Sequence, residues 1–233
     1  MMSTNSPRET FDRAQQKLLD QVLILGSMVE QSVQAALIAL QRRDFAAART
    51  IYAADQRVNE KRYALEHDCI TLIATQQPMA RDARFLAAIL EIITELERIG
   101  DYAKGICKIN LLMSEDPIDP PVMFYLQQMA ELGLDMLRRA LDAFVNKDAA
   151  AARAIPYEDD VVDDLYNQVY RSLLAQMTAD PASVDRGSHL MWAAHNLERM
   201  ADRVSNICER IVYVSTGELK ELESFDDMGA NRE

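Results

Sequence analysis

Two pairs of acidic side chains stand four residues apart at matching places in the two halves of this sequence. Glu97 and Asp101 form the first pair, and Glu198 and Asp202 form the second. On an α-helix, a spacing of four residues places both carboxylates on one face, one turn apart. Like charges so placed repel each other, and their burial requires a compensating arginine, lysine or metal ion.

A further acidic segment precedes each pair. Asp55 and Asn59 correspond to Asp159 and Asp163, which lie 104 positions later and are again four residues apart. Carboxylates on two facing helices would offer the oxygen ligands that hard cations prefer. We therefore predict one metal site in each half, for a divalent or ferric ion: magnesium, manganese, iron or zinc. The predicted ligands are Asp55, Asn59, Glu97, Asp101, Asp159, Asp163, Glu198 and Asp202.

A competing interpretation of these acids needs no metal. The chain contains 37 acidic residues, so pairs four residues apart also arise by chance and are then solvated or partnered by arginine. Arg98 and Arg199 directly follow the two glutamates and are expected to screen their acidic neighbours, or else to contact a partner protein. Recurrence of the pattern in both halves is the observation that favours metal binding.

The composition predicts a chain that is helical almost throughout. Of 233 residues, 49% are hydrophobic, and Gly and Pro number only seven each. Long stretches are rich in strong helix formers. A formal net charge of −12 opposes binding to nucleic acid and direct adsorption to an anionic membrane. The three cysteines show no C-x-x-C spacing and are expected to be small buried hydrophobic residues.

The sequence also predicts a cytoplasmic location. Residues 1–20 carry no apolar signal region. The most apolar stretch, residues 86–93, is interrupted by Glu91 long before the ~20 residues that a membrane span needs. Membrane association is therefore expected only at the inner face and only through protein partners, without direct insertion.

Helix signals divide the chain into two triplets. The first helix is expected to begin at a capping box, Ser6 to Glu9, and Asp44 is expected to cap the second, with Asp55 as a place where that helix can kink. Residues 114–121 contain three prolines and no helical period, so they form a linker. The predicted helices cover residues 7–43, 44–76, 82–113, 122–146, 148–178 and 183–216.

The two triplets are copies of one unit. Residues around Glu97 recur 101 positions later, around Glu198, and residues around Asp44 recur 104 positions later, around Asp148. The sequence thus predicts an all-α fold of two tandem three-helix bundles with pseudo-twofold symmetry. Its expected parts are residues 1–113 for the first bundle, 114–121 for the linker, 122–216 for the second bundle and 217–233 for an acidic, disordered tail.

These motifs resemble those of the PhoU family over nearly the whole chain. They are LERIGD at residues 96–101 and LERMAD at 197–202, preceded by DQRVN at 55–59 and DDVVD at 159–163. The resemblance implies tandem three-helix bundles, surface metal clusters in some members and homodimers. It also implies a negative regulator of phosphate uptake and of the phosphate-starvation response, which contacts a sensor histidine kinase and the ATPase of the phosphate ABC transporter. Asn59 departs from the acidic pattern and implies a weaker first metal site.

Two other functions compete with this expectation. A carboxylate-bridged di-metal enzyme needs Glu-x-x-His on two helices, whereas here His195 precedes Glu198 by three, in one copy only. The sequence has no glycine-rich phosphate loop, nucleophile-elbow serine or concentrated arginine cluster. Catalysis is therefore not expected, and phosphate is expected to be sensed elsewhere. The remaining alternatives are a helical adaptor that needs no metal and a metal-binding bundle of another transport system.

Overall fold

The computed structural model describes residues 7–113 and 117–222, and the regular elements within these ranges are all helices. Ser6 of the expected capping box, residues 114–116 of the linker and residues 223–233 of the tail lie outside the described residues. The α-helices are α1 (Pro7–Arg42), α2 (Phe45–Gln76), α3 (Arg81–Leu112), α4 (Pro120–Asn146), α5 (Ala149–Ala154), α6 (Asp159–Ala179) and α7 (Val184–Thr216). Two short 3-10 helices are η1 (Ile155–Glu158) and η2 (Pro181–Ser183).

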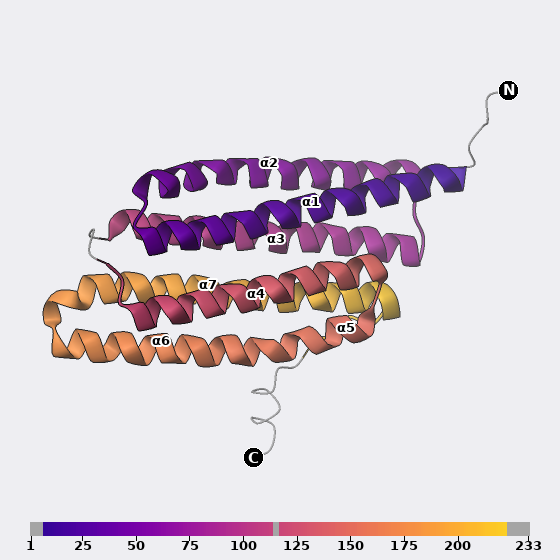
Figure 1. The fold of residues 1–233 in the computed structure, drawn as a ribbon. Helices are drawn as coiled ribbons and strands as arrows, with labels where there is room; N and C mark the ends of the chain where they lie inside the picture. Colours follow the sequence, from indigo (N-terminus) through magenta and orange to yellow (C-terminus); the bar gives the residue numbers. More distant parts are fainter. Residues whose placement is uncertain (1–6, 114–116, 223–233) are drawn as a thin grey trace, which may run out of the picture.

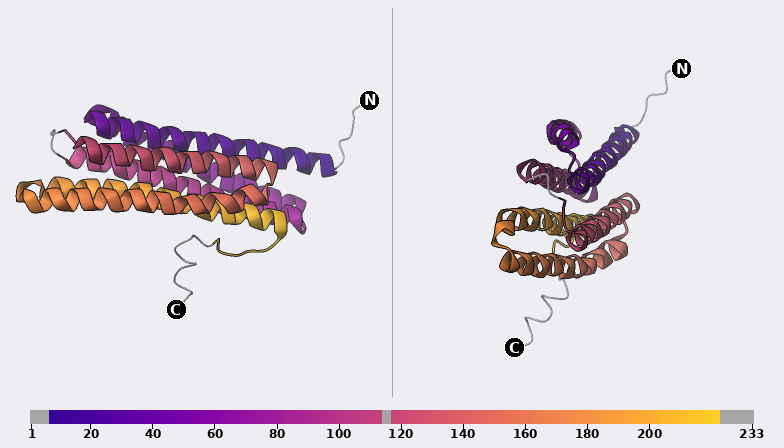
Figure 2. Two further views of the ribbon diagram at one scale, coloured as in Figure 1. Left: turned by 60° about the horizontal axis from the view of Figure 1, so that its bottom comes forward. Right: turned by 60° about the vertical axis from the view of Figure 1, so that its left-hand side comes forward.

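The helices form two bundles that lie one on the other (Figure 1). Helices α1, α2 and α3 build the first bundle, and α4, the α5–α6 segment and α7 build the second. Figure 2 shows the two bundles as separate layers, and α3 and α7 pack against each other at the centre. Phe85 of α3 stacks on Phe144 of α4 with ring centroids 5.3 Å apart, so the apolar core is continuous between the layers. The predicted all-α fold of two three-helix repeats is confirmed.

Matching aspartates start the second helical segment of each repeat. The Asp44 carboxylate accepts a hydrogen bond of 2.9 Å from the Ala47 N–H, and Asp148 accepts one of 3.0 Å from the Ala151 N–H. Both aspartates have extended backbones, as N-cap residues do. The predicted cap at Asp44 is confirmed, and its repetition at Asp148 places the two following segments in equivalent positions.

The helix expected over residues 148–178 is broken, and this prediction was wrong. Pro156 lacks an N–H and cannot continue the α-helix, so the chain passes through η1 before α6 begins at Asp159. The equivalent position in the first repeat is Tyr52, and α2 continues through Asp55 as one uninterrupted α-helix. The break therefore belongs to the second repeat alone, where it places the Asp159 carboxylate in the first turn of α6.

Two expected boundaries also need correction. Helix α4 begins at Pro120, two residues before the predicted helix start at Val122, because proline is well suited to the first turn of a helix. Beyond Gly217, which ends α7 with φ of +82°, residues 218–222 turn back onto the second bundle. The Leu222 N–H donates a hydrogen bond of 3.2 Å to Glu209 Oε1, and its side chain packs against the core. This part of the expected tail is thus ordered.

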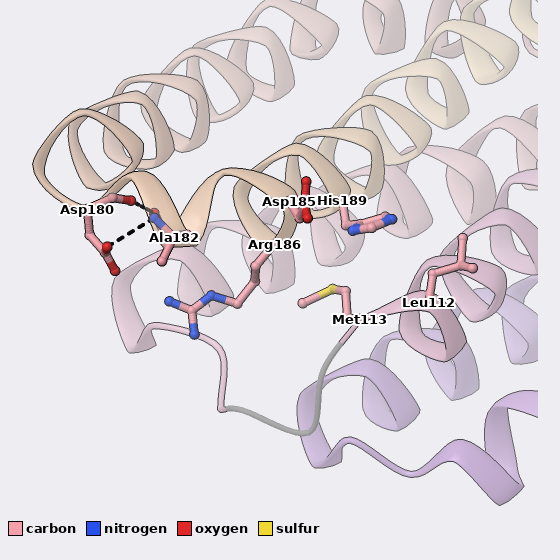
Figure 3. Close-up of a pocket in the computed structure, with 8 residues that line it drawn as sticks. Leu112, Met113, Asp180, Ala182, Asp185, Arg186 and His189 are labelled. Carbon is pink, nitrogen blue, oxygen red and sulfur yellow. Dashed lines mark hydrogen bonds between the residues drawn. The ribbon is translucent and has the colours of Figure 1, made fainter.

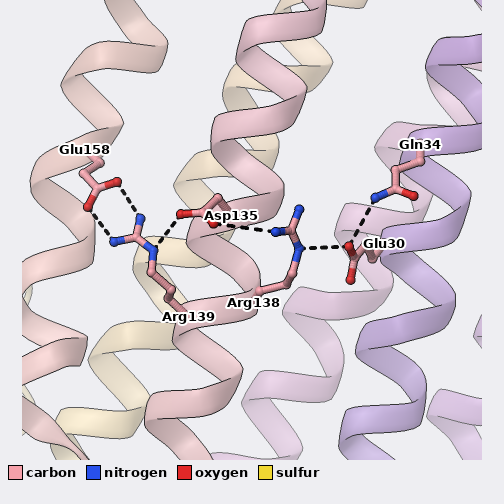
Figure 4. Close-up of polar contacts among 6 residues, drawn as sticks. All are labelled: Glu30, Gln34, Asp135, Arg138, Arg139 and Glu158. Carbon is pink, nitrogen blue, oxygen red and sulfur yellow. Dashed lines mark hydrogen bonds and ion pairs between the residues drawn. The ribbon is translucent and has the colours of Figure 1, made fainter.

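A ladder of ion pairs crosses from the first bundle to the second (Figure 4). Arg138 of α4 contacts Glu30 of α1, with Nε and Oε1 2.9 Å apart, and Arg139 contacts Glu158 of η1 at 2.5 Å. Both arginines also contact Asp135. These side chains are partly exposed, so each pair stabilises the fold by no more than ~1 kcal/mol. The ladder orients the bundles, and the apolar core supplies most of the stability.

Helix α1 and the cysteines show how the apolar residues are used. Within the described residues, α1 has the length and the apolar composition that a membrane-spanning helix needs. Core helices of other proteins also meet this criterion. Its side chains Val22, Leu25 and Val29 are fully buried in the first bundle.

All three cysteines are free and buried, as predicted, and burial raises their thiol pKa values to about 11 or 12.

Candidate metal centre

The four predicted acids of the second repeat lie together between α6 and α7. Burial and the charge of Asp202 raise the pKa of Asp159 to about 7, with further contributions from the other acids. Burial, Asp202 and Asp163 likewise raise the pKa of Glu198 to about 7. Because each carboxylate lies in the field of its neighbours, the predicted grouping of Asp159, Asp163, Glu198 and Asp202 is a true cluster.

Two arginines contact Asp202 in this second cluster. Arg199 Nη1 lies 2.7 Å from Asp202 Oδ2, and Arg203 Nη2 lies 3.9 Å from the same oxygen. His195 Nδ1 is 3.2 Å from Glu198 Oε2 without forming a hydrogen bond, and its side chain is largely exposed. Asp159 Oδ1 and Glu198 Oε2 are buried and have no hydrogen-bond partner among the residues that the structure describes. The cluster therefore holds unsatisfied oxygen atoms, which are costly unless a cation reaches them.

In the first repeat, a lysine compensates the charge of a buried carboxylate. Asp55, only 5% exposed, accepts hydrogen bonds from Lys104 Nζ at 2.7 Å and from Asn59 Nδ2 at 3.1 Å. Lys104 also lies 3.7 Å from Asp101 Oδ1. Burial and the charge of Asp101 raise the pKa of Glu97, so all four predicted positions do come together. Here the compensating cation belongs to the chain itself.

Lys104 is the member of the first cluster that the spacing of the acidic residues did not indicate. The position 101 residues later holds Ser205, whose buried Oγ has no hydrogen-bond partner. A comparison of the two copies shows this exchange of lysine for serine, and it is the signal that distinguishes the two sites. The second cluster therefore lacks the internal ammonium that neutralises the first.

The donor sets fit a hard metal ion unequally. Among the described residues, no three His, Cys, Asp or Glu side chains stand ready as a metal-binding group. In the second repeat, the unsatisfied oxygens of Asp159 and Glu198 are of the type that such ions bind. In the first repeat, Lys104 and Asn59 already donate to Asp55. The chemistry of the donors thus favours the second cluster.

The arginines that follow the two glutamates both screen acidic neighbours, as expected. Arg199 pairs with Asp202, with Nη1 2.7 Å from Oδ2. Arg98 donates to Glu95 Oε1 at 2.7 Å, and its charge also partly offsets the effects that raise the pKa of Glu97. Glu95 is buried against α7, where it also contacts Arg203 at 3.4 Å. Arg98 therefore contacts the buried glutamate at which the two bundles meet.

A cavity of about 500 Å³ lies away from both acidic clusters (Figure 3). It forms where α3 ends and α7 begins, and the Ala182 N–H at its edge donates to Asp180 Oδ1 at 3.1 Å. Its lining combines two carboxylates, Asp180 and Asp185, with Arg186 and His189. None of the predicted ligands contributes to it. Its lining residues are Leu112, Met113, Asp180, Ala182, Ser183, Asp185, Arg186 and His189.

Duplicated three-helix bundles that carry one acidic cluster each place this chain in a class of all-helical proteins built from two copies of one unit. The model of the PhoU domain matches this chain twice, over residues 22–109 and 126–211. The chain belongs to the PhoU family.

Named relatives and solved structures agree with this membership. The chain is 35% identical, over 92% of its length and 99% of the relative, to the phosphate-specific transport system accessory protein PhoU homolog of Streptococcus pneumoniae serotype 4. It is 33% identical to PhoU of Escherichia coli K12 over 89% of this chain and 86% of that protein. The crystal structure of PhoU from S. pneumoniae superposes with a TM-score of 0.85 at 34% identity, covering 91% of this chain and all (100%) of that one. PhoU from Pseudomonas aeruginosa gives 0.83 at 29% identity, covering 89% and 100%.

Proposed function

We propose that this protein is a non-enzymatic regulator of phosphate transport that restrains phosphate uptake and the phosphate-starvation response. The observation that carries the proposal is agreement over nearly the whole length of relatives named as phosphate transport accessory proteins. On this proposal the protein works as a homodimer at the cytoplasmic face of the membrane. Its partners are a sensor histidine kinase and the ATPase of the phosphate ABC transporter.

The metal part of the proposal concerns the second repeat. Asp159, Asp163, Glu198 and Asp202 would hold a magnesium, manganese, iron or zinc ion, which would neutralise their mutual repulsion. Buried oxygens without partners support this assignment. The first cluster would bind metal more weakly, because Lys104 occupies the position of a cation beside Asp55. Metal would then stabilise the face that partner proteins contact.

The regulatory proposal is tested with a deletion strain carrying a phosphate-starvation reporter, grown in phosphate-rich medium. We expect high reporter output that falls when the wild-type gene is restored. If regulation requires the second cluster, a gene carrying Asp163→Asn should restore repression poorly in the deletion strain. Asp164→Asn is the matched control, because Asp164 is the exposed neighbour of Asp163 on the same helix. Unchanged output on deletion would refute the proposed role.

A metal-independent helical adaptor is the second candidate, and one observation favours it. Lys104 shows that a cluster of this kind can be compensated without a metal ion. Elemental analysis of protein purified without chelator separates the two candidates. A metal-independent adaptor should show no stoichiometric metal, that is, a metal-to-protein ratio well below one. In that case Asp163→Asn and Asp164→Asn should restore repression equally well.

A further inference from the structure

A small cavity lies at the junction of the two bundles, opposite the end that holds the linker. It has a volume of about 90 Å³, room for roughly three water molecules. The first bundle contributes the start of α1 and the start of α3, and the second contributes the end of α4 and the end of α7 (Figure 1). Its lining residues are Arg8, Gln15, Arg81, Asp82, Phe85, Lys147 and Val214.

The lining of this junction cavity is basic, in a chain with a net charge of −12. Arg8 is already paired, with Nη1 2.5 Å from Asp82 Oδ2. Within the part of the chain that the structure describes, Arg81 and Lys147 have no carboxylate partner. Lys147 lies over the Phe85 ring, with Nζ 5.7 Å from the centroid, which leaves its charge unneutralised. Two cations therefore remain available at the cavity.

The start of α3 adds further positive character beside the junction cavity, although the Asp82 and Arg84 N–H groups already donate to the Met79 and Ala80 carbonyls. Helix α3 begins at Arg81, and its N-cap residue, Ala80, makes no side-chain capping hydrogen bond. The first-turn N–H groups of a helix attract anions. Arg84, one turn further along α3, has a buried Nε without a hydrogen-bond partner. Positive charge at the junction cavity thus comes from the start of α3 and from Arg81 and Lys147, which belong to different bundles.

We propose that the junction cavity binds a small tetrahedral oxyanion of the inorganic phosphate class. Its volume suits such an ion and excludes a nucleotide, and guanidinium and ammonium groups are the usual donors to phosphate oxygens. Because Arg81 and Lys147 belong to different bundles, the bound ion would join them. No sequence pattern indicated this cavity, because the residues that line it come from four separate segments of the chain. The inference goes beyond the proposed function and stands on the cavity alone.

Isothermal titration calorimetry of the full chain with inorganic phosphate tests the site. EDTA in the buffer removes metal ions, so phosphate cannot bind through a metal at the acidic clusters. We expect saturable binding that sulfate competes with and that chloride at equal ionic strength does not. Arg81→Gln and Lys147→Gln, one in each bundle, should each weaken binding by at least about tenfold, because each removes a charged donor.

Two control variants make the result specific. Arg49→Gln changes the charge equally at an exposed position of α2 near the other end of the first bundle, and should leave the affinity unchanged. Asp202→Asn alters the second acidic cluster and should also leave it unchanged, whether or not the regulatory proposal holds. Circular dichroism checks that each variant is folded. Absence of saturable binding by the wild-type chain, or equal weakening by Arg49→Gln, would overturn the proposal.

Discussion

Glu95 provides a direct test of how the two bundles are held together. It lies where α3 packs against α7 and is 6% exposed. Its Oε2 accepts from Arg203 Nη1 at 3.4 Å and from Asn206 Nδ2 at 3.3 Å, both on α7. Its Oε1 accepts from Arg98 at 2.7 Å. Replacement of this single carboxylate removes the polar centre of the interface.

We expect Glu95→Ala to lower the free energy of unfolding by about 3 kcal/mol. Removal of one partner of a buried ion pair costs ~3–5 kcal/mol, because the other charge remains buried. Arg203 is 14% exposed, and its remaining partner, Asp202, is 3.9 Å away. The lower end of this range applies because the contact between Arg203 and Glu95, at 3.4 Å, is long. A loss of about 3 kcal/mol corresponds to a fall in Tm of roughly 6–12 °C for a chain of this size.

Urea unfolding followed by circular dichroism measures this loss. Glu30→Ala is the matched control, since Glu30 also joins the bundles, through Arg138, but its side chain is 26% exposed. It should cost less than about 1 kcal/mol. The double variant Glu95→Leu with Arg203→Met should recover most of the loss, because it leaves no buried charge unpaired. If Glu95→Ala costs no more than Glu30→Ala, the reasoning about burial is wrong.

Three further predictions concern the acids and the thiols. In metal-free protein the pKa values of Asp159 and Glu198 are raised to about 7 from 3.8 and 4.5, so the folded state binds more protons, and the urea midpoint should fall as pH rises from about 5 to 8. A midpoint that rises over that range would contradict this. Ser205→Lys should weaken manganese binding at least about tenfold, and Lys104→Ser should strengthen it in the first repeat, as measured by calorimetry. Ellman's reagent at pH 8 should leave all three thiols of the native protein unmodified and label them after unfolding, because burial raises their pKa values to about 11 or 12.

Local signals predicted most of the helices correctly. Asp44 and Asp148 cap equivalent helical segments, and helical periodicity placed α1, α3 and α7 within a few residues. Pro156 is a strong local signal against that pattern, and it divides the helix expected over residues 148–178 of the second bundle into α5, η1 and α6. Periodicity averages over many residues, whereas a single missing N–H is enough to end a helix.

The acidic positions were predictable, but their compensation was not. Repetition identified all eight candidate ligands, since duplicated helices bring equivalent positions together. Lys104 contacts Asp55 from another helix, 49 residues away in sequence, and a pattern within one helix gives no information about such a pair. The junction cavity is a similar case, because Arg81 and Lys147 approach only when the bundles pack. Charge patterning therefore located the acids, and tertiary structure decided which acids lack a cation.

Arg203 connects the candidate metal centre to the junction of the bundles. It contacts Glu95 of the first bundle at 3.4 Å and Asp202 of the second cluster at 3.9 Å. A metal ion that binds Asp202 would compete with Arg203 for this carboxylate and leave the guanidinium more strongly paired with Glu95. The coupling between manganese binding and the Glu95–Arg203 contact is reciprocal. If manganese strengthens that contact, Glu95→Ala should weaken manganese binding by the same free energy. Equal manganese affinities of Glu95→Ala and wild type would show that Arg203 does not transmit between the two sites.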